Sequence, residues 1–108
     1  MKNRLFIGMM LGSMAISSVA AAQPIPLKFA KGSYCTSWSG TARTTRPQFS
    51  AFLLANQSIS VNADYAWHVN GGRRTVYGEE FVTNTKGNYI FTFDVRKGTY
   101  FNFEICAN

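Results

Sequence analysis

The sequence is poor in the side chains on which most metal and cofactor sites depend. Its 108 residues include one histidine, two cysteines and five acidic residues. A dedicated metal site needs several histidine, cysteine or carboxylate ligands close together, and here these residue types are few and scattered along the chain. We therefore expect neither a bound metal nor a cofactor.

The same shortage argues against a catalytic set. A serine hydrolase would have to use His68 with Asp64 or Asp94 as the orienting acid, and the sequence has no Gly-x-Ser-x-Gly elbow. The adjacent Glu79 and Glu80 would point to opposite sides of a strand, so they could not act together on one substrate as an acid/base pair. We expect that the protein is not an enzyme, with a minor hydrolase activity as the remaining alternative.

Long apolar runs are also missing beyond the first 22 residues. Lys2 and Arg4 precede the short apolar stretch 5–16, and the small residues 20–22 follow it. This order is typical of a secretory signal peptide, and the stretch is too short for a membrane span. We expect cleavage after Ala22, no transmembrane segment in the remainder, and a periplasmic or secreted protein.

The remaining chain is small and mildly basic. Residues 23–108 number 108 − 22 = 86, enough for a single domain. Without Lys2 and Arg4, the 11 lysines and arginines fall to 9, and with five acids the formal net charge is +4. This charge suits an anionic partner but does not require one. Because the charge is modest and no aromatic–basic RNP-like strand is present, we expect no nucleic-acid binding.

Two aromatic stretches near the C-terminus have the alternation of β-strands. In 88–95 and in 99–105, phenylalanines and β-branched residues share one face while polar residues share the other. The segment Arg96-Lys97-Gly98 between them has a glycine where a positive φ angle is needed. These features predict a hairpin with a G1-type bulge, whose two apolar faces meet on one side.

The rest of the chain has the same character. No segment has a sustained helical stripe of apolar residues, and turn residues separate several short strand patterns. The further predicted strands are 25–29, 33–38, 48–54, 58–62, 65–69, 73–77 and 79–83. This pattern predicts an all-β fold, a small antiparallel β-sandwich or barrel formed by the single domain 23–108.

The two cysteines allow one intramolecular disulfide, between Cys35 and Cys106. Both are predicted on polar strand faces, as an outer cross-link between terminal strands requires. Such a bond would enclose about seventy residues, for which the chain-entropy model assigns about 4–5 kcal/mol. The alternative, a redox-active pair, lacks a Cys-x-x-Cys motif.

Three stretches are candidate binding surfaces. The first is the predicted hairpin around Asn70-Gly71-Gly72, which joins Arg73 and Arg74 to Trp67. Arginine pairs bind carboxylates and phosphates well. The alternative is that Trp67 belongs to the core and that the two arginines form a solvated edge which discourages aggregation.

The second candidate is the basic loop 43–47 with Arg43 and Arg46, which could also be an ordinary connection. The third is the turn 85–89, which contains Lys86, Gly87 and Tyr89. Tyr89 shares the face of the phenylalanines that follow it, so a core position is the alternative for this side chain.

The order of these features resembles a known group of exported proteins. The stretches Lys28–Gly32, Gln57–Val61 and Lys86–Tyr89 are similar to segments of the periplasmic lysozyme inhibitors of the i-type and g-type classes, and of pre-peptidase C-terminal-like β-sandwich modules. The resemblance implies a β-sandwich fold. It also implies a Ser-Gly-x-Tyr-like loop that enters the lysozyme cleft, in which Gly87 and Tyr89 match and Lys86 takes the serine position.

These observations favour an exported, non-catalytic binding protein of the cell envelope, with a protein or an envelope glycan as partner. Inhibition of a cell-wall hydrolase such as lysozyme is the sharpest form of this hypothesis. Binding of an anionic envelope glycan or lipopolysaccharide is the alternative.

Overall fold

The computed structural model describes residues 23–108, and the predicted signal peptide lies outside this range. The described residues form strands joined by loops, with no helix that is long and apolar enough to cross a membrane. The strands are β2 (Ile25–Pro26), β3 (Cys35–Thr41), β4 (Gln48–Leu53), β5 (Ser58–Ala63), β6 (Trp67–Gly71), β7 (Arg74–Tyr77), β8 (Phe81–Val82), β9 (Gly87–Phe93) and β10 (Tyr100–Ala107).

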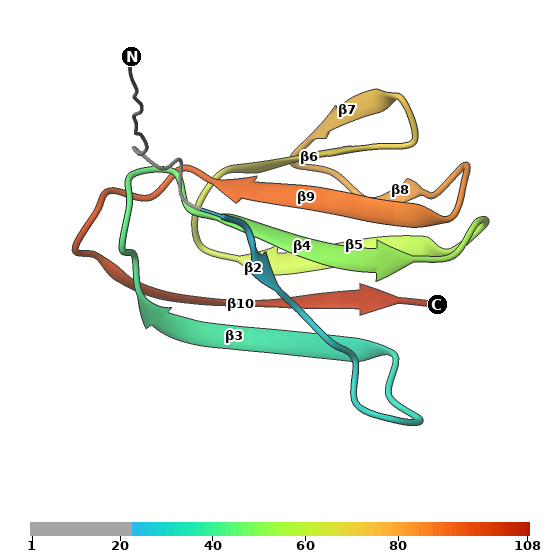
Figure 1. Cartoon of the computed structure of the whole chain (residues 1–108), viewed down its shortest axis with the longest axis horizontal. Helices are drawn as coiled ribbons and strands as arrows, with labels where there is room; N and C mark the ends of the chain where they lie inside the picture. Colours follow the sequence, from blue (N-terminus) through green and yellow to red (C-terminus); the bar gives the residue numbers. More distant parts are fainter. Residues whose placement is uncertain (1–22) are drawn as a thin grey trace, which may run out of the picture.

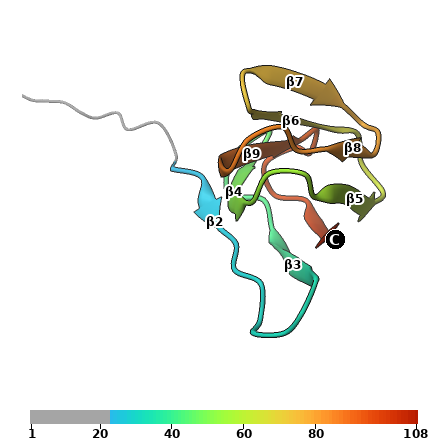
Figure 2. The same cartoon turned by 90° about the vertical axis from the view of Figure 1, so that its right-hand side faces the viewer.

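The strands form two sheets that pack face to face (Figure 1). One sheet has four strands in the order β3-β10-β5-β8, and the other has five in the order β2-β4-β9-β6-β7. All pairings are antiparallel except that of the two-residue β2 with β4. The view along the strands shows the two layers with β2 at one margin (Figure 2). The predicted all-β sandwich is therefore confirmed.

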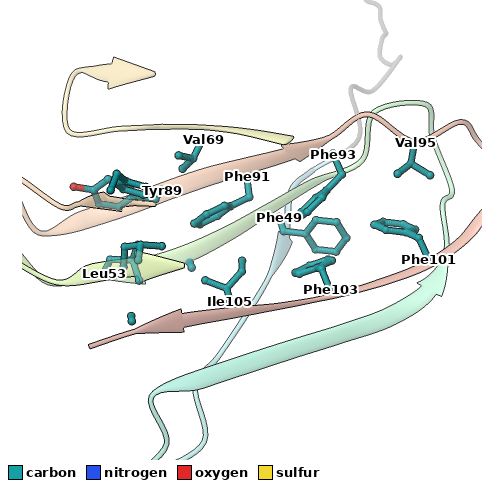
Figure 3. Close-up of a cluster of buried hydrophobic side chains, with 14 of the residues drawn as sticks. Phe49, Leu53, Val69, Tyr89, Phe91, Phe93, Val95, Phe101, Phe103 and Ile105 are labelled. Carbon is teal, nitrogen blue, oxygen red and sulfur yellow. The ribbon is translucent and has the colours of Figure 1, made fainter. Parts of the chain in front are cut away.

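Alternation along the strands fills the space between the sheets with aromatic rings (Figure 3). Phe49 of β4 and Phe93 of β9 face Phe101 and Phe103 of β10. The rings of Phe93 and Phe103 are stacked with centroids 4.3 Å apart, and those of Phe49 and Phe103 meet edge to face at 4.8 Å. Burying a phenylalanine side chain stabilises a fold by about 1.5–3 kcal/mol before entropy is counted, so this cluster is a main source of stability.

The predicted hairpin between the last two long strands is wrong. β9 belongs to the five-stranded sheet and β10 to the four-stranded sheet, so the two strands face each other across the core. β9 ends at Phe93 and β10 begins at Tyr100, and the connection therefore has six residues, 94–99. Val95 is buried within it, and Gly98 has the predicted positive φ of 92°. The apolar faces do meet, but each belongs to a different sheet.

The predicted disulfide is confirmed. Cys35 and Cys106 are partners in the register of β3 and β10, and their sulfur atoms are bonded. Both side chains lie on the outer face of the four-stranded sheet, because their neighbours Thr36 and Ile105 point inward. The bond ties an edge strand to an interior strand of the sheet, and it fits an oxidising compartment.

Candidate functional site: a basic loop end

Two loops lie against each other at one end of the sandwich, at the left in Figure 1. They are the β3–β4 loop, 42–47, and the β9–β10 connection, 94–99; we call them the basic loop end. Four hydrogen bonds join them: Ala42 N to Thr99 O, Gly98 N to Ala42 O and Arg46 N to Val95 O, each 2.8 Å, and Lys97 N to Thr45 Oγ1, 3.2 Å. Buried Ala42, Pro47 and Val95 anchor both loops in the core. The pair is therefore held in one arrangement.

The exposed side chains of the basic loop end are mostly cationic. Arg43 and Arg46 come from the first loop, Arg96 and Lys97 from the second, and all four are exposed. The only acid in the two loops is Asp94, whose Oδ1 lies 3.8 Å from Nε of Arg46. Both side chains of this pair are about 70% exposed (67% and 70%), so the pair adds little stability. Four cations against one carboxylate give this end a net charge of +3.

A shallow hollow adjoins the arginines. It is lined by residues 43–47 of the first loop, by Gln48 at the start of β4, and by Gln23 and the β2 residue Ile25. The half-buried Ile25 supplies an apolar surface, while Arg43 and Arg46 supply charge. A concave apolar surface with a few polar groups at its margin is the usual form of a recognition site. The basic loop end can therefore hold an anionic group from a partner and bury some apolar surface beside it.

The opposite end of the sandwich holds Arg73, Arg74, Lys86, Gly87 and Tyr89, whereas Trp67, the register partner of Phe93, begins β6 next to the basic loop end. Gly72 and Arg73 form the two-residue turn of the β6–β7 hairpin, with φ angles of 60° and 65°, as a type I′ turn requires. Asn84 Nδ2 donates a 2.9 Å hydrogen bond to the carbonyl of Gly72 and so ties this turn to the neighbouring turn 84–86. Arg73 and Lys86 are exposed on the two turns, and we call this surface the distal turns.

Tyr89 and Trp67 are placed in or against the core. Tyr89 is 1% exposed, and its hydroxyl donates a 2.7 Å hydrogen bond to the carbonyl of Thr85. It therefore braces the distal turns from inside, and its ring is not accessible to a partner. Trp67 is half-buried, with its ring centroid 6.2 Å from that of Phe91. In the segment 86–89, the side chain of Lys86 is exposed at the turn. Lys86 is followed by Gly87, which has a φ of 152°.

The structure thus separates the predicted site residues into two ends. Arg43 and Arg46 belong to the basic loop end, whereas Arg73, Lys86 and Gly87 belong to the distal turns. Sequence reasoning missed Arg96 and Lys97, which it assigned to a hairpin turn. Their basic character was visible in the sequence, but their position beside Arg43 and Arg46 depends on the crossing of β9 to β10 between sheets.

The residues that a serine hydrolase would require are not linked to one another. His68 is half-buried on the outer face of β6, with its ring 5.6 Å from that of Tyr77. Within residues 23–108, no hydrogen bond or ion pair joins it to Asp64 or Asp94. The one cluster of metal-ligand side chains found in the same range comprises Glu104 with Cys35 and Cys106, and both of these sulfurs are already bonded to each other.

Arg73 and Arg74 are expected to differ in their effect on stability. Arg74 Nη2 donates to the carbonyl of Val82, and its guanidinium lies 5.7 Å from the ring centroid of Phe81, so it links the hairpin to β8. An exposed cation–π contact contributes about 0.5–1 kcal/mol. We expect Arg74→Ala to lower the free energy of unfolding by about 1 kcal/mol, while Arg73→Ala changes it by less than about 0.5 kcal/mol, as is usual at exposed sites.

Urea unfolding of the two single variants and of the double variant measures this difference. Arg74→Lys is the control, because lysine keeps the charge but not the planar group that stacks on Phe81. If both alanine variants lowered the free energy of unfolding by the same small amount, the contacts of Arg74 with Val82 and Phe81 would not contribute to stability.

Comparisons with known proteins agree with this architecture. No protein-family model and no curated protein matches the chain. Among solved structures, it is similar to Salmonella Typhimurium PliG, a periplasmic lysozyme inhibitor of g-type lysozyme, with a TM-score of 0.69, 13% identity, and coverage of 82% of this chain and 100% of that chain. It is also similar to a mutant of PliG-Ec, a periplasmic lysozyme inhibitor of g-type lysozyme from Escherichia coli. Here the TM-score is 0.67 and the identity 15%, with coverage of 82% of this chain and 100% of that chain. The resemblance predicted from the sequence is therefore confirmed for the fold.

Proposed function

We propose that this chain is a periplasmic binding protein that inhibits a lysozyme, and that the basic loop end contacts the lysozyme cleft. The observation that supports the proposal most is the likeness of fold over the full length of two periplasmic inhibitors of g-type lysozyme. A confirmed disulfide fits an exported protein. The proposal is one of binding without catalysis.

Charge favours the basic loop end as the contact. Glycoside hydrolases commonly use two carboxyl groups beside the scissile bond, so their clefts are acidic at the centre even where the whole enzyme is basic. Arg43, Arg46 and Arg96 present guanidinium groups, which bind carboxylates in a bidentate manner. The loops are fixed by hydrogen bonds before binding, so little ordering entropy is lost on association.

The distal turns are the competing contact. They contain Lys86 and Gly87, which correspond to the Ser-Gly part of the loop that enters the lysozyme cleft in the resembling inhibitors. Lysine replaces serine there, and the matching Tyr89 is buried. The surface that remains accessible is therefore formed by Lys86 and Arg73, with less positive charge than the basic loop end.

The test is inhibition of a g-type lysozyme by the purified protein and by two matched variants. Replacing Arg43, Arg46, Arg96 and Lys97 by alanine is expected to weaken inhibition more than tenfold, because truncating one partner of a buried charge pair costs about 2–5 kcal/mol. Arg73→Ala with Lys86→Ala is expected to leave inhibition within about threefold of the wild type. Both variants alter exposed side chains, so thermal unfolding serves as the check on folding.

The reverse result, loss only in the distal-turn variant, would move the contact to the distal turns and keep the inhibitor proposal. Failure of the wild-type protein against g-type and i-type lysozymes would overturn the inhibitor proposal. Salt-sensitive retention on lipopolysaccharide, lost in the basic-loop variant, would then favour the anionic envelope glycan as partner.

A further inference from the structure

The outer face of the four-stranded sheet differs in chemistry from the rest of the molecule. β3, β10, β5 and β8 contain no lysine or arginine, although the chain as a whole is basic. A groove crosses this face. Its polar lining consists of Ser37 and Ser39 from β3, Asn102 and Glu104 from β10, Asn62 from β5, and Asp64, which follows β5. We call these six residues the polar groove.

The polar groove is an ordered array of hydrogen-bonding groups. Glu104 is the register partner of Ser37 on one side and of Asn62 on the other, and Asn102 is the partner of Ser39. Neighbouring strands lie about 4.8 Å apart, and side chains on one face recur about every 7 Å along a strand. Hydroxyl, carboxylate and carboxamide groups are therefore set out in rows across three strands.

These side chains have no partner within the described part of the chain. None of the six makes a side-chain hydrogen bond or an ion pair with another of residues 23–108. On the outer face of the other sheet, by contrast, two pairs of polar side chains are hydrogen-bonded: Gln48 Nε2 donates to Thr92 Oγ1, and Asn70 Nδ2 donates to Thr75 Oγ1. The donors and acceptors of the polar groove are thus free for a ligand.

An exposed aromatic ring lies on the same face. Tyr100, the first residue of β10, is 64% exposed and is the register partner of Thr41. It precedes Asn102 and Glu104 by two and four residues, so all three side chains project to the same side of the strand. A planar ring beside free hydroxyl, amide and carboxylate groups matches a sugar chain, whose C–H face stacks on aromatic rings while its hydroxyls both donate and accept hydrogen bonds.

We propose that the polar groove, with Tyr100 at one end, binds an uncharged oligosaccharide. Charge selects this class of ligand, because Asp64 and Glu104 repel sulfated, phosphorylated or uronic-acid chains and no strand of this sheet carries a cation to offset them. Asn62, Asn102 and the two serines would hold hydroxyl groups, and the ring of Tyr100 would hold one sugar face. The Tyr100 end of this surface adjoins the basic loop end, but none of its residues belongs to those loops, so the inference does not depend on that proposal.

The experiment titrates the disulfide-bonded protein, labelled with ¹⁵N, with three hexasaccharides: N-acetylated chitohexaose and cellohexaose, which are uncharged, and fully deacetylated chitohexaose, which is cationic. We expect an uncharged hexasaccharide to shift the amide signals of β3, β10 and β5. Tyr100→Ala and, separately, Asn102→Ala with Glu104→Ala should weaken this binding at least tenfold. Asn88→Ala, an exposed asparagine on the outer face of the other sheet, should leave it unchanged.

The basic-loop variant should also bind the sugar normally, which separates this test from that of lysozyme inhibition. Absence of binding to both uncharged chains would overturn the proposal. So would binding of the cationic chain alone, since that would indicate simple attraction to two carboxylates. Equal binding by the wild type and the Tyr100 and Asn102/Glu104 variants would place the sugar elsewhere and would overturn it as well.

Discussion

Removal of the Cys35–Cys106 disulfide is expected to lower the free energy of unfolding by about 4 kcal/mol. The bond closes a loop with a sequence separation of 71 residues, and the chain-entropy model assigns about 3 kcal/mol to a 15-residue loop and about 4.7 to a 100-residue loop. A domain of this size has a total stability of about 5–15 kcal/mol, so the loss is a large share of the whole. The reduced protein should therefore be partly unfolded near body temperature.

The measurement compares urea unfolding of the wild type with that of the double variant Cys35→Ala, Cys106→Ala. The reduced wild type serves as control, because it lacks the bond but keeps both sulfur-bearing side chains. Both proteins should lose similar stability. A loss below about 1 kcal/mol in both would show that the strand pairing of β3 with β10 alone holds this part of the sheet.

Tyr89→Ala is expected to cost about 3–5 kcal/mol, the usual range for truncating a buried aromatic side chain. The ring is 1% exposed, and it fills the space beneath Gly71, where an added Cβ atom would lie 2.6 Å from the ring's Cγ. Tyr89→Phe keeps the ring and loses only the hydroxyl, which lies 2.7 Å from Thr85 O and 3.4 Å from Asn84 Oδ1, so about 1 kcal/mol is expected for that change. Gly71→Ala should destabilise the same place by overpacking, by about 1–3 kcal/mol.

Urea unfolding of the three variants orders these effects. If Tyr89→Ala were as stable as the wild type, the ring would not be part of the core. This result bears on tests of inhibition as well, because a loss of binding in Tyr89→Ala would follow from unfolding. Lys86→Ala is the suitable variant for testing the distal turns, since its side chain is exposed.

The sequence predicted the strands well because a two-residue period of apolar side chains is a direct consequence of one buried face. It also predicted the disulfide, since two cysteines permit a single pair. For Tyr89, the candidate binding role was wrong and the alternative, a core position, holds. The hairpin of 88–95 with 99–105 was wrong because alternation shows only that each strand has a buried face. Two strands paired in one sheet and two strands facing each other across a core have the same pattern.

Connection length was the missing information. Val95 and Thr99 continue the alternation, so the predicted connection had three residues, whereas the strands stop at Phe93 and resume at Tyr100. Six residues can cross the gap of about 10 Å between packed sheets, and three favour a hairpin. For the same reason, the sequence predicted only the first of the two loops of the basic loop end as a candidate binding surface. Arg96 and Lys97 lie about fifty positions after Arg43 and Arg46, and only the crossing brings the two pairs together.

The position of β10 between β3 and β5 has a consequence for how the protein is made. The four-stranded sheet has no centre until residues 100–107 are available, and Cys35 must wait for Cys106 before the disulfide can form. During synthesis, β3 and β5 therefore have no shared neighbour to pair with until β10 emerges. Most pairings in this sheet are distant in sequence, which makes folding slow. Under the proposed export of this chain, the late position of β10 would keep the four-stranded sheet from closing until the last strand has crossed the membrane.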